Sequence, residues 1–517
     1  MPRVHIDNRE VDVPAGSTVL TAARQLGIDI PTLCHRDDCA PNTTCLVCLV
    51  KMVRDGESVG RFVPACATVV TDGMRVESET PEVHEQRRTA LELLLSDHAG
   101  QCRAPCQYAC PFGTDVPRML RQVGAGDWAA AAATLRESMP LAAVLARVTP
   151  HGGERGCRLG RCAGGEALAI GLLMRQVADK DLAAADPHVP PFMPASGKRV
   201  AIVGAGPAGL AAAYSVVRCG HACTMFEMQA EVGGRLRELP ESVLPPEVLA
   251  AEIALLTRLG VNIKQNATID GEAGLAGLRG THDAVVLAVG SAGTAAWSAV
   301  LRVTDERIAA DRTTHETSLP GVFAAGDAAR ACADAVRAAV DGKAVAVCVD
   351  QHLRGEAVTG ARKLAALRLA RAEDDSPGQG SAQVVPSAGA VAGYSDDEAR
   401  EEAGRCLHCD CAKLESCRLR RYAERYSADA ARYRGRRRQG GVRRQQGDVV
   451  YDPGKCILCG LCVQIAQREG EPLGLTFIGR GFDVRVDVPF DASLAEGLHR
   501  AARRCAEACP TGALSML

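Results

Sequence analysis

Cysteine content constrains this chain more than any other feature, because 23 of its 517 residues are cysteines and most stand in close groups. The N-terminus, Met1 to Asp7, lacks the apolar stretch of a secretory signal peptide, so we expect a cytoplasmic protein. In a reducing cytosol, grouped cysteines are more often metal ligands than disulfides. We therefore predict metal sites at the groups and core positions for the isolated cysteines (Cys219, Cys223, Cys332 and Cys348).

The length predicts several domains, because one hydrophobic core rarely serves more than about 300 residues. Residues 1–80 have short strand patterns and a helix that begins near Ser17 and is capped by it, and residues 81–185 have a helical pattern. Residues 186–365 alternate between strand and helix patterns, 366–447 form a polar linker with a cysteine motif, and 448–517 form a last small domain. This order predicts a multidomain protein of α+β and α/β class. No apolar run is long enough to predict a membrane span.

The first cysteine group, Cys34-x10-Cys45-x2-Cys48-x17-Cys66, provides four thiols for the two irons of a [2Fe–2S] cluster. The plant-type spacing C-x4-C-x2-C does not fit, because Asn42 stands where a cysteine is required. The group resembles the N-terminal [2Fe–2S] domain of the large iron–sulfur subunit of complex I and of related hydrogenases. That resemblance implies a β-grasp ferredoxin domain, with a zinc site as the alternative.

A second group begins with Cys102, Cys106 and Cys110 and ends with Cys157 and Cys162. It resembles the helical N-terminal domain of the glutamate synthase small subunit, which holds two [4Fe–4S] clusters. Two cysteines of that pattern are replaced here by Thr149 and Gly153, and neither residue can ligate iron as a thiolate does. We therefore predict a single [4Fe–4S] cluster, with the retained thiols as ligands (Cys102, Cys106 and Cys157).

The fourth ligand of this second cluster is either His98 or Cys162. The spacing His98-x3-Cys102 is also similar to the complex I cluster that is held by one histidine and three cysteines. Cys110 matches the lost cluster and is either an unused remnant or a ligand. Two clusters, or none, are the alternatives for the group as a whole.

A third group, Cys406-x2-Cys409-x-Cys411-x5-Cys417, follows a predicted helix at residues 396–404. It is similar to a segment of larger relatives of the glutamate synthase small subunit. We expect these four cysteines to hold a [4Fe–4S] cluster, with zinc or no metal as the alternatives.

The last group, Cys456-x2-Cys459-x2-Cys462, is the start of a ferredoxin motif. Ala466 replaces the next cysteine of that motif, which in two-cluster ferredoxins ligates the other cluster, so this site keeps its own ligands. Cys509, which precedes a proline, is the expected fourth ligand, and Cys505 is spare. We predict one [4Fe–4S] cluster in a small ferredoxin-like domain, which makes two to three [4Fe–4S] clusters in the chain.

Residues 199–203 form a predicted buried strand that leads into Gly204-x-Gly206-x-x-Gly209 and a helix. The first glycine allows the tight turn, the second lets the backbone approach a pyrophosphate at the helix N-terminus, and the third permits close helix–sheet packing. Glu227 ends the next strand, where a carboxylate binds a ribose hydroxyl. Strand, helix and acid in this register predict a Rossmann-like dinucleotide domain.

Two later segments resemble motifs of flavoproteins with two dinucleotide domains. Residues 231–236 are similar to their second glycine motif, and residues 320–327 to their late FAD motif, whose aspartate contacts the ribityl–phosphate part. The resemblance implies FAD rather than NAD. The implied FAD contacts are Gly204, Gly206, Pro207, Ala208, Gly209, Glu227, Gly234, Arg235, Leu236, Gly290, Gly326 and Asp327.

The flavin is expected to have no nicotinamide partner on this chain. In the glutamate synthase small subunit, a strand that ends in a glycine motif leads into an NADPH-binding domain of over a hundred residues. Here that strand ends at Gly290, only 33 positions before Phe323, which is too short for a second dinucleotide fold. Electrons are therefore expected to come from, or go to, iron–sulfur clusters or another subunit.

Together the resemblances imply an electron-transfer subunit of a multi-subunit NAD-linked oxidoreductase, such as a formate dehydrogenase or hydrogenase. Its implied partners are a diaphorase-type flavoprotein and a catalytic subunit, and both electron relay and electron bifurcation are open. No acid–base pair stands out, so we predict no catalytic side chain. The alternatives are a self-sufficient NAD(P)H-dependent oxidoreductase and a non-enzymatic zinc protein. The basic run at 432–444 predicts a connector or docking patch rather than a nucleic-acid site.

Overall fold

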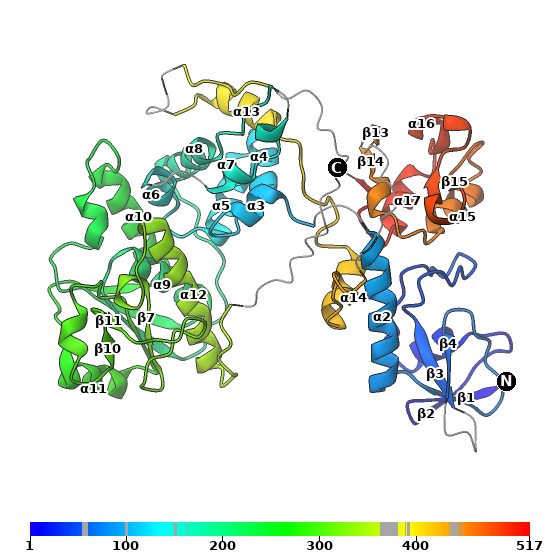
Figure 1. Cartoon of the computed structure of the whole chain (residues 1–517), viewed down its shortest axis with the longest axis horizontal. Coiled ribbons are helices and arrows are strands. Elements are labelled where there is room, and N and C mark those ends of the chain that lie inside the picture. The colour runs from blue at the N-terminus through cyan, green and yellow to red at the C-terminus, as the bar shows by residue number, and fades with distance from the viewer. Residues whose placement is uncertain are drawn as a thin grey trace. The chain divides into compact units, whose positions relative to one another are not determined.

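The computed structural model describes residues 1–516 except for 54–59, 99–101, 149–151, 163, 362–380, 388, 390–392, 434, 436–443 and 447. Most of the basic run and Thr149 therefore lie outside the described residues. The chain forms two compact units, shown in Figure 1. Unit 1 consists of residues 1–103, 365–376 and 410–517, and unit 2 of residues 104–364 and 377–409. Each unit is described by itself.

Unit 1 begins with a mixed five-stranded sheet in the order β2-β1-β5-β3-β4. Its strands are β1 (Arg3–Ile6), β2 (Arg9–Asp12), β3 (Leu49–Val53), β4 (Arg61–Pro64) and β5 (Met74–Glu77). The short helix α1 (Val19–Gln25) contributes buried alanines and aliphatic residues to the same core. Its N-cap is Thr18, whose hydroxyl accepts the Thr21 N–H, so the predicted cap at Ser17 was wrong by one position.

Two further helices of unit 1 are α2 (Pro81–Asp97) and α14 (Arg418–Arg425). They pack together around the buried Arg87, which donates to the Leu49 carbonyl at 3.0 Å and to the Tyr426 hydroxyl at 2.9 Å. Proline at the start of α2 follows the cap Thr80, as expected for a first helical turn. The first predicted domain and the C-terminal cysteine segment therefore share one unit.

The C-terminal part of unit 1 is a small α+β domain. It contains β13 (Arg444–Gln446), β14 (Val449–Tyr451), α15 (Leu461–Arg468), β15 (Thr476–Ile478), β16 (Arg485–Asp487), α16 (Leu494–Gly497), α17 (Ala502–Ala508) and β17 (Leu514–Met516). The antiparallel strands β13, β14 and β17 form one sheet, and β15 pairs with β16. The helices α15 and α17 pack against each other, and both border the loops that carry the last cysteine group.

Unit 2 opens with a helical layer: α3 (Pro105–Ala109), α4 (Val116–Gly124), α5 (Trp128–Ser138), α6 (Ala142–Val148), α7 (Gly152–Gly156) and α8 (Ile170–Ala183). Helix α13 (Asp396–Gly404) returns to this layer from much later in the chain and packs against α4. Its predicted bounds are confirmed, and Ser395 and Glu398 form a capping box at its start.

The rest of unit 2 is built on a parallel five-stranded sheet in the order β12-β9-β6-β7-β8. Its strands are β6 (Arg199–Val203), β7 (Ala222–Phe226), β8 (Asn262–Lys264), β9 (Ala284–Leu287) and β12 (Val322–Ala324). The helices are α9 (Pro207–Arg218), α10 (Pro246–Arg258), α11 (Gly271–Thr281) and α12 (Ala335–Leu353). Near-continuous apolar runs such as those of β6 and β9 are typical of strands covered on both faces. The strand order reverses between β6 and β9, where doubly wound sheets bind ligands.

The segment between Gly290 and β12 holds a 3₁₀ turn (Thr294–Trp297) and a two-stranded hairpin of β10 (Val303–Thr304) and β11 (Arg307–Ile308). Trp297 is fully buried beneath the parallel sheet, so this segment packs as part of the same domain. Within residues 290–322, all of which are described, there is no second parallel sheet. Among the described helices, none is both long and apolar enough to cross a membrane.

Candidate cofactor sites

The first four cysteines lie together beside the β3–β4 hairpin. Cys48 precedes β3 and Cys66 follows β4, and antiparallel pairing of these strands brings the two residues side by side. Contact with the Cys45 thiol lowers the pKa of Cys34 to about 5, and contact with Cys66 lowers the pKa of Cys48. The pKa of each partner rises correspondingly, because each pair holds a proton in common. Cys34 and Cys48 therefore lose their protons more readily than a free cysteine does, and a thiolate is the form that binds iron.

The last group lines one cavity, where Cys456, Cys459, Cys462 and Cys509 lie together with apolar residues such as Tyr451 and Val486. Burial raises the pKa of Cys459 and Cys462, so neutral thiols are favoured until a cation compensates for the buried charge. Backbone N–H groups already point at two of the sulfurs, from Leu458 to Cys456 Sγ at 3.4 Å and from Leu514 to Cys509 Sγ at 3.5 Å. A four-thiol, water-poor cavity with N–H donors fits a [4Fe–4S] cluster.

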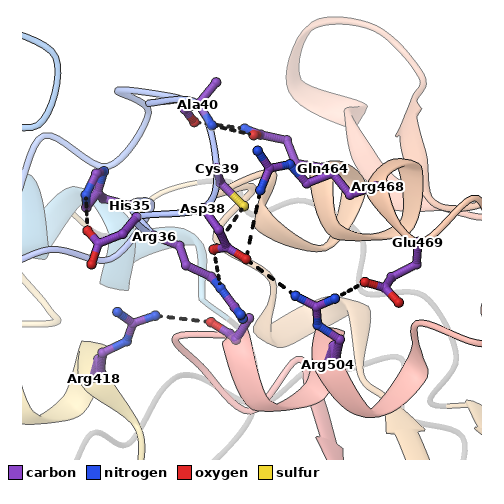
Figure 2. A network of polar contacts seen from close by, with 12 residues as sticks. His35, Arg36, Asp38, Cys39, Ala40, Arg418, Gln464, Arg468, Glu469 and Arg504 are labelled. Carbon is purple, nitrogen blue, oxygen red and sulfur yellow. Dashed lines mark hydrogen bonds and ion pairs between the residues drawn. The ribbon is translucent and has the colours of Figure 1, made fainter. Parts of the chain in front are cut away.

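The loops of these two groups contact each other within unit 1. Asn42 Nδ2 donates to the Cys459 carbonyl at 2.7 Å, and Gln464 Nε2 donates to Asn42 Oδ1 at 2.8 Å. The Gln464 side chain also accepts the Ala40 N–H and donates to the Ala40 carbonyl, so α15 contacts the main chain of this loop. Figure 2 shows the bonds between Ala40 of this loop and Gln464. The Cys34 thiolate is close enough to act on Cys459, whose pKa burial raises first and nearby thiolates raise further.

Charged side chains extend the same contact. Asp38 pairs with Arg36 at 2.5 Å, with Arg504 at 3.4 Å and with Arg468 at 3.9 Å (Figure 2). Its pKa is lowered by the hydrogen bond from Arg36. Asn42 occupies the position that would be a cysteine in a plant-type ferredoxin, and the structure uses it to join two cysteine loops. Sequence reasoning treated this residue only as a mismatch.

The second and third groups are divided between the units. Cys102 lies in unit 1, whereas Cys106, Cys157 and Cys162 lie in unit 2. Likewise Cys406 and Cys409 belong to unit 2 and Cys411 and Cys417 to unit 1. The proposed ligand His98 is buried at the end of α2 in unit 1. Cys162 donates to the Arg158 carbonyl at 3.5 Å, and Cys110 is buried in the helical core. These two sets of predicted ligands stay predictions.

Within the described residues, no three His, Cys, Asp or Glu side chains converge on a point as they would around a single metal ion. The predicted spare thiol Cys505 is buried, and it donates to the Cys462 carbonyl at 3.6 Å. Ala466 is fully buried on α15. The isolated thiols Cys223 and Cys348 are buried as well, and Cys219 and Cys332 are partly so.

The predicted glycines form a narrow turn at the carboxyl end of β6. Gly204 has a φ of +100°, and a Cβ there would lie 2.4 Å from the Ala288 carbonyl oxygen of the neighbouring strand end. A Cβ on Gly209 would lie 2.0 Å from the Gly204 carbonyl, so α9 starts directly against the turn. A Cβ on Gly206 would meet open space, which leaves room for a ligand at the N-terminus of α9. These features suit a pyrophosphate.

Polar groups border the same turn. The buried Glu227 accepts the Ala205 N–H at 2.8 Å and the Gln229 N–H at 2.9 Å. Gly234 lies against Gly206, since a Cβ on it would be 3.1 Å from the Gly206 Cα. The largely exposed Arg235 reaches Asp327 at 3.3 Å. The two glycine motifs and the late aspartate are thus brought together from three separate segments.

The remaining predicted flavin residues support this arrangement. Pro207 and Ala208 form the first turn of α9, Leu236 is buried behind the second glycine motif, and Gly290 has open space around it. Sequence reasoning missed two residues of α12. Asp341 accepts the Gly326 N–H at 2.7 Å, and Gly342 lets α12 approach α9 so closely that a Cβ would lie 2.0 Å from the Ala208 carbonyl.

Four parts of the chain match known protein families. Residues 2–81 match a 2Fe-2S iron-sulfur cluster binding domain, and residues 80–185 match dihydropyrimidine dehydrogenase domain II, 4Fe-4S cluster. Residues 177–342 match the pyridine nucleotide-disulphide oxidoreductase family, and residues 449–516 a 4Fe-4S single cluster domain. The chain is therefore a multidomain redox protein with iron–sulfur cluster domains and a dinucleotide-binding domain. The match to the third family is compatible with either FAD or NAD(P).

Curated relatives cover parts of the chain. It is 38% identical over 205 residues to the NAD-dependent dihydropyrimidine dehydrogenase subunit PreT of Escherichia coli K12, which is 38% of this chain and 49% of that protein. It is 36% identical over 209 residues to the NADP(+)-dependent formate dehydrogenase subunit beta of Moorella thermoacetica, covering 36% of this chain and 29% of the relative. The chain thus spans half or less of the length of the curated relatives it matches.

Two other similarities concern a smaller share of the chain. One of the NADH-quinone oxidoreductase subunits of Rhizobium meliloti is 45% identical over 102 residues, 20% of this chain and 12% of the relative. A solved NAD+-reducing [NiFe]-hydrogenase in the H2-reduced state is 29% identical, covers 19% of this chain and 39% of its own, and has a TM-score of 0.17.

Proposed function

We propose that this chain is an electron-transfer iron–sulfur flavoprotein and a subunit of a multi-subunit NAD-linked oxidoreductase. The observation that carries the proposal is the contact between two cysteine loops in unit 1, where Asn42 donates to the Cys459 carbonyl. A protein that used its cysteines only for structure would not need to set two four-thiol sites against each other. A protein that conducts electrons between clusters needs neighbouring cysteine sites, because electron transfer requires the redox centres to be close.

The cofactors that we propose are one FAD, one [2Fe–2S] cluster and two to three [4Fe–4S] clusters. When bound, the clusters exchange single electrons and the flavin exchanges one or two, and the protein binds, places and tunes them. The four thiols at residues 34–66 and the four that line the C-terminal cavity fit the first and last clusters. Leu458 and Leu514 direct N–H groups to the sulfurs, and such donors stabilise a reduced, more negative site.

The flavin proposal rests on the junction of three segments at the carboxyl end of β6. Gly206 leaves the N-terminus of α9 open to a pyrophosphate, and Glu227 lies at the end of β7, where it can exchange its backbone partners for a ribose hydroxyl. Asp327 and Arg235 lie on the far side of this turn, paired with each other. Residues 290–322 form a hairpin and a 3₁₀ turn rather than a nicotinamide domain.

The partners in this proposal are a diaphorase-type flavoprotein and a catalytic subunit. Its support is that the relatives include proteins described as subunits of a formate dehydrogenase and of a dihydropyrimidine dehydrogenase. Co-purification of the full chain with its native partners, followed by identification of the bound subunits, tests this part. Recovery of a single polypeptide that reduces an acceptor by itself would contradict it.

The cofactor content is tested by iron, sulfide, zinc and flavin analysis of anaerobically purified protein. We expect at least about ten iron atoms per chain, because one [2Fe–2S] and two [4Fe–4S] clusters require that number. Iron below about six atoms per chain, or zinc in its place, would refute the multi-cluster proposal in favour of a structural zinc protein.

The alternative of a self-sufficient NAD(P)H-dependent reductase is supported by the family match of residues 177–342. Anaerobic mixing of the isolated chain with NADH or NADPH separates the two. We expect no rapid bleaching of the flavin absorbance without a partner subunit, while dithionite bleaches it fully. Rapid bleaching by either nucleotide would overturn the subunit proposal.

A further inference from the structure

We propose that the cysteine motif at residues 406–417 does not form a cluster of its own but is divided between two iron–sulfur sites. In unit 2, its first two cysteines complete a four-thiol site with two cysteines of the helical layer (Cys106, Cys157, Cys406 and Cys409). In unit 1, its last two cysteines share a site with one earlier cysteine (Cys102, Cys411 and Cys417). The inference rests on the proposed iron–sulfur function and names which thiols act together.

The first two cysteines of the unit 2 site are brought together by the packing of α3 on α7. Cys106 is on α3, and Cys157 directly follows α7. A Cβ on Gly156 would lie 2.5 Å from the Pro105 carbonyl oxygen, and one on Gly152 would lie 2.8 Å from that of Ala109, so the two helices touch through their backbones. Both thiols border the same hydrophobic core.

The other two cysteines of the unit 2 site, Cys406 and Cys409, lie directly after α13. This helix packs on α4, and His408 Nδ1 lies 3.5 Å from a guanidinium nitrogen of Arg121 on that helix. Cys406 packs against the same core as Cys106. Cys106 interacts electrostatically with Cys406, Cys409 and Cys157, which places all four thiols in one neighbourhood.

The loop at 406–409 has the backbone geometry of the cysteine loop at 456–459. In each, the residue before the second cysteine has a left-handed φ, +44° at His408 and +54° at Leu458. In each, that residue directs its N–H to the first cysteine sulfur, 3.4 Å away. A left-handed φ is uncommon for a residue other than glycine. Its repetition, with the same N–H to sulfur contact, indicates the same kind of site.

The unit 1 site forms where residues 411–417 meet two other segments. The Cys411 N–H donates to the Cys102 carbonyl at 3.2 Å, and the Cys411 sulfur lies against Gly512, where a Cβ would be 2.3 Å away. The Arg418 N–H donates to the Pro510 carbonyl at 3.0 Å, which fixes Cys417 at the start of α14. Cys411 and Cys417 also interact electrostatically with Cys102, which places the three thiols in one neighbourhood.

This division accounts for the cysteines that the helical domain lacks. Gly153 stands where the related domains have a ligand, and a glycine cannot replace a thiolate. A four-thiol site at Cys106 and Cys157 needs two more cysteines, and the loop after α13 contains two, Cys406 and Cys409. Four thiolates are the usual ligand set of a [4Fe–4S] cluster, and these four residues provide that set within one unit.

The test compares iron loss in paired cysteine-to-serine variants of the full chain, purified anaerobically. Each pair is C106S/C157S, C406S/C409S or C411S/C417S, and the first two are also combined. We expect each pair to lose about four iron atoms and one reduced-cluster EPR signal. The combination of the first two pairs should lose no more than either alone, because both remove the same cluster. C409S with C411S should lose about eight atoms, because these residues serve different clusters.

The opposite pattern would overturn the inference. If residues 406–417 hold their own cluster, C409S with C411S loses only about four iron atoms, and combining C106S/C157S with C406S/C409S loses about eight. A wild-type chain without iron would instead refute the proposed function, so the two failures are distinguishable. Cys219→Ser at the end of α9 is the matched control and should lose no iron. Flavin content reports folding, and where a pair fails to fold, the single substitutions C106S, C409S and C411S are compared in the same way.

Discussion

At the scale of single residues, Glu227 supports the glycine turn of the proposed FAD site. Its buried carboxylate accepts two backbone N–H groups, from Ala205 in the glycine turn and from Gln229 beyond β7. A carboxylate has two acceptor oxygens, whereas an amide has only one, so the residue type and not only its size is required. The same acid that would meet a ribose thus also fixes the turn.

We expect Glu227→Gln to weaken FAD binding at least tenfold and to destabilise the domain by about 1–3 kcal/mol, because one buried N–H loses its acceptor. Fluorescence titration of the deflavinated protein measures the affinity, and denaturant unfolding measures the stability. Glu241→Gln, at an exposed position outside both glycine motifs, is the control and should change neither. Equal flavin affinity in wild type and Glu227→Gln would contradict the role assigned to this carboxylate.

The residues whose roles sequence reasoning predicted are those with local patterns. Gly204 and Gly209 were assigned from spacing, and the structure gives each a backbone contact that excludes a side chain. Asp341 and Gly342 were missed, because their contacts with Gly326 and Ala208 come from helix packing that no short motif encodes. The role of Asn42 was missed for the same reason, since its partners are more than 400 positions away.

At the scale of elements, a buried ionic triad joins three helices of unit 2. Arg136 on α5 pairs with Asp181 on α8 at 2.5 Å and with Glu252 on α10 at 3.0 Å, and all three side chains are nearly inaccessible. The two carboxylates raise the pKa of Arg136 against the effect of burial. The helical layer and the parallel sheet domain are therefore tied together by charge as well as by apolar packing.

Arg136→Met should destabilise unit 2 by about 3–5 kcal/mol, because it leaves two buried carboxylates without a cation. Replacing all three residues by apolar ones of similar size should cost less, since no buried charge remains and only the Ala143 and His188 N–H groups lose their acceptors. Thermal or urea unfolding followed by flavin fluorescence measures both variants. Arg118→Met, whose partner Glu137 is exposed, is the control for loss of a surface pair and should cost under about 1 kcal/mol. A triple variant as unstable as Arg136→Met would contradict this account.

Lys343 gives a second prediction at this scale, because α12 buries its amine against the helical layer. The Nζ donates to the Ser138 carbonyl at 2.7 Å and to that of Phe112 at 3.2 Å, and burial lowers its pKa to about 8. Between about pH 8 and 10.5 the unfolded chain therefore binds more protons at this site than the folded chain. The stability contributed by this group rises with pH across that window and is constant below it.

We expect the free energy of unfolding of wild type, relative to Lys343→Met, to increase by up to about 3 kcal/mol between pH 7.5 and 10.5. Urea unfolding monitored by flavin fluorescence at several pH values gives this difference directly. Lys264→Met, which changes a lysine near Phe226 on the sheet domain, is the control and should show no such pH dependence relative to wild type. A flat difference for Lys343→Met would mean that the amine is solvated.

At the scale of the whole molecule, the predicted linear order of domains does not match the compact units. The [2Fe–2S] part, α2 and the C-terminal 4Fe-4S part form unit 1, while the helical layer joins the dinucleotide-binding part in unit 2. Periodicity and motifs predict the elements and most of the thiol groups, but they carry no information on which distant segments pack together. The motif at 406–417 shows the consequence. Its sequence pattern predicts one site, but its four cysteines are divided between the two units. One residue of the chain, Asp410, separates Cys409 of one proposed site from Cys411 of the other.

The contact between Asn42 and the C-terminal cysteine loop is the part of the molecule on which the proposed function depends most. Asn42→Ala removes the donor to the Cys459 carbonyl and the acceptor for Gln464, and Gln464→Ala removes the bonds to Ala40. We expect Asn42→Ala to destabilise unit 1 by about 1–3 kcal/mol, because the partly buried Cys459 carbonyl loses its donor, and Gln464→Ala to cost less, because its Ala40 partners are exposed. We also expect the double variant to cost less than the sum of the two, because the residues share a bond.

The functional effect of combining Asn42→Ala with Gln464→Ala should appear in how fast electrons equilibrate between the two clusters. In wild type, rapid-freeze EPR after mixing with a substoichiometric reductant should show the [2Fe–2S] and C-terminal [4Fe–4S] signals reaching equilibrium together. In the double variant the two signals should diverge at early times, while iron and flavin contents stay unchanged. Gln467→Ala, on an exposed face of the same helix α15, should leave both the signals and the stability as in wild type. Unchanged equilibration in a double variant that is measurably less stable would show that this contact is structural only, and the electron path would have to run elsewhere.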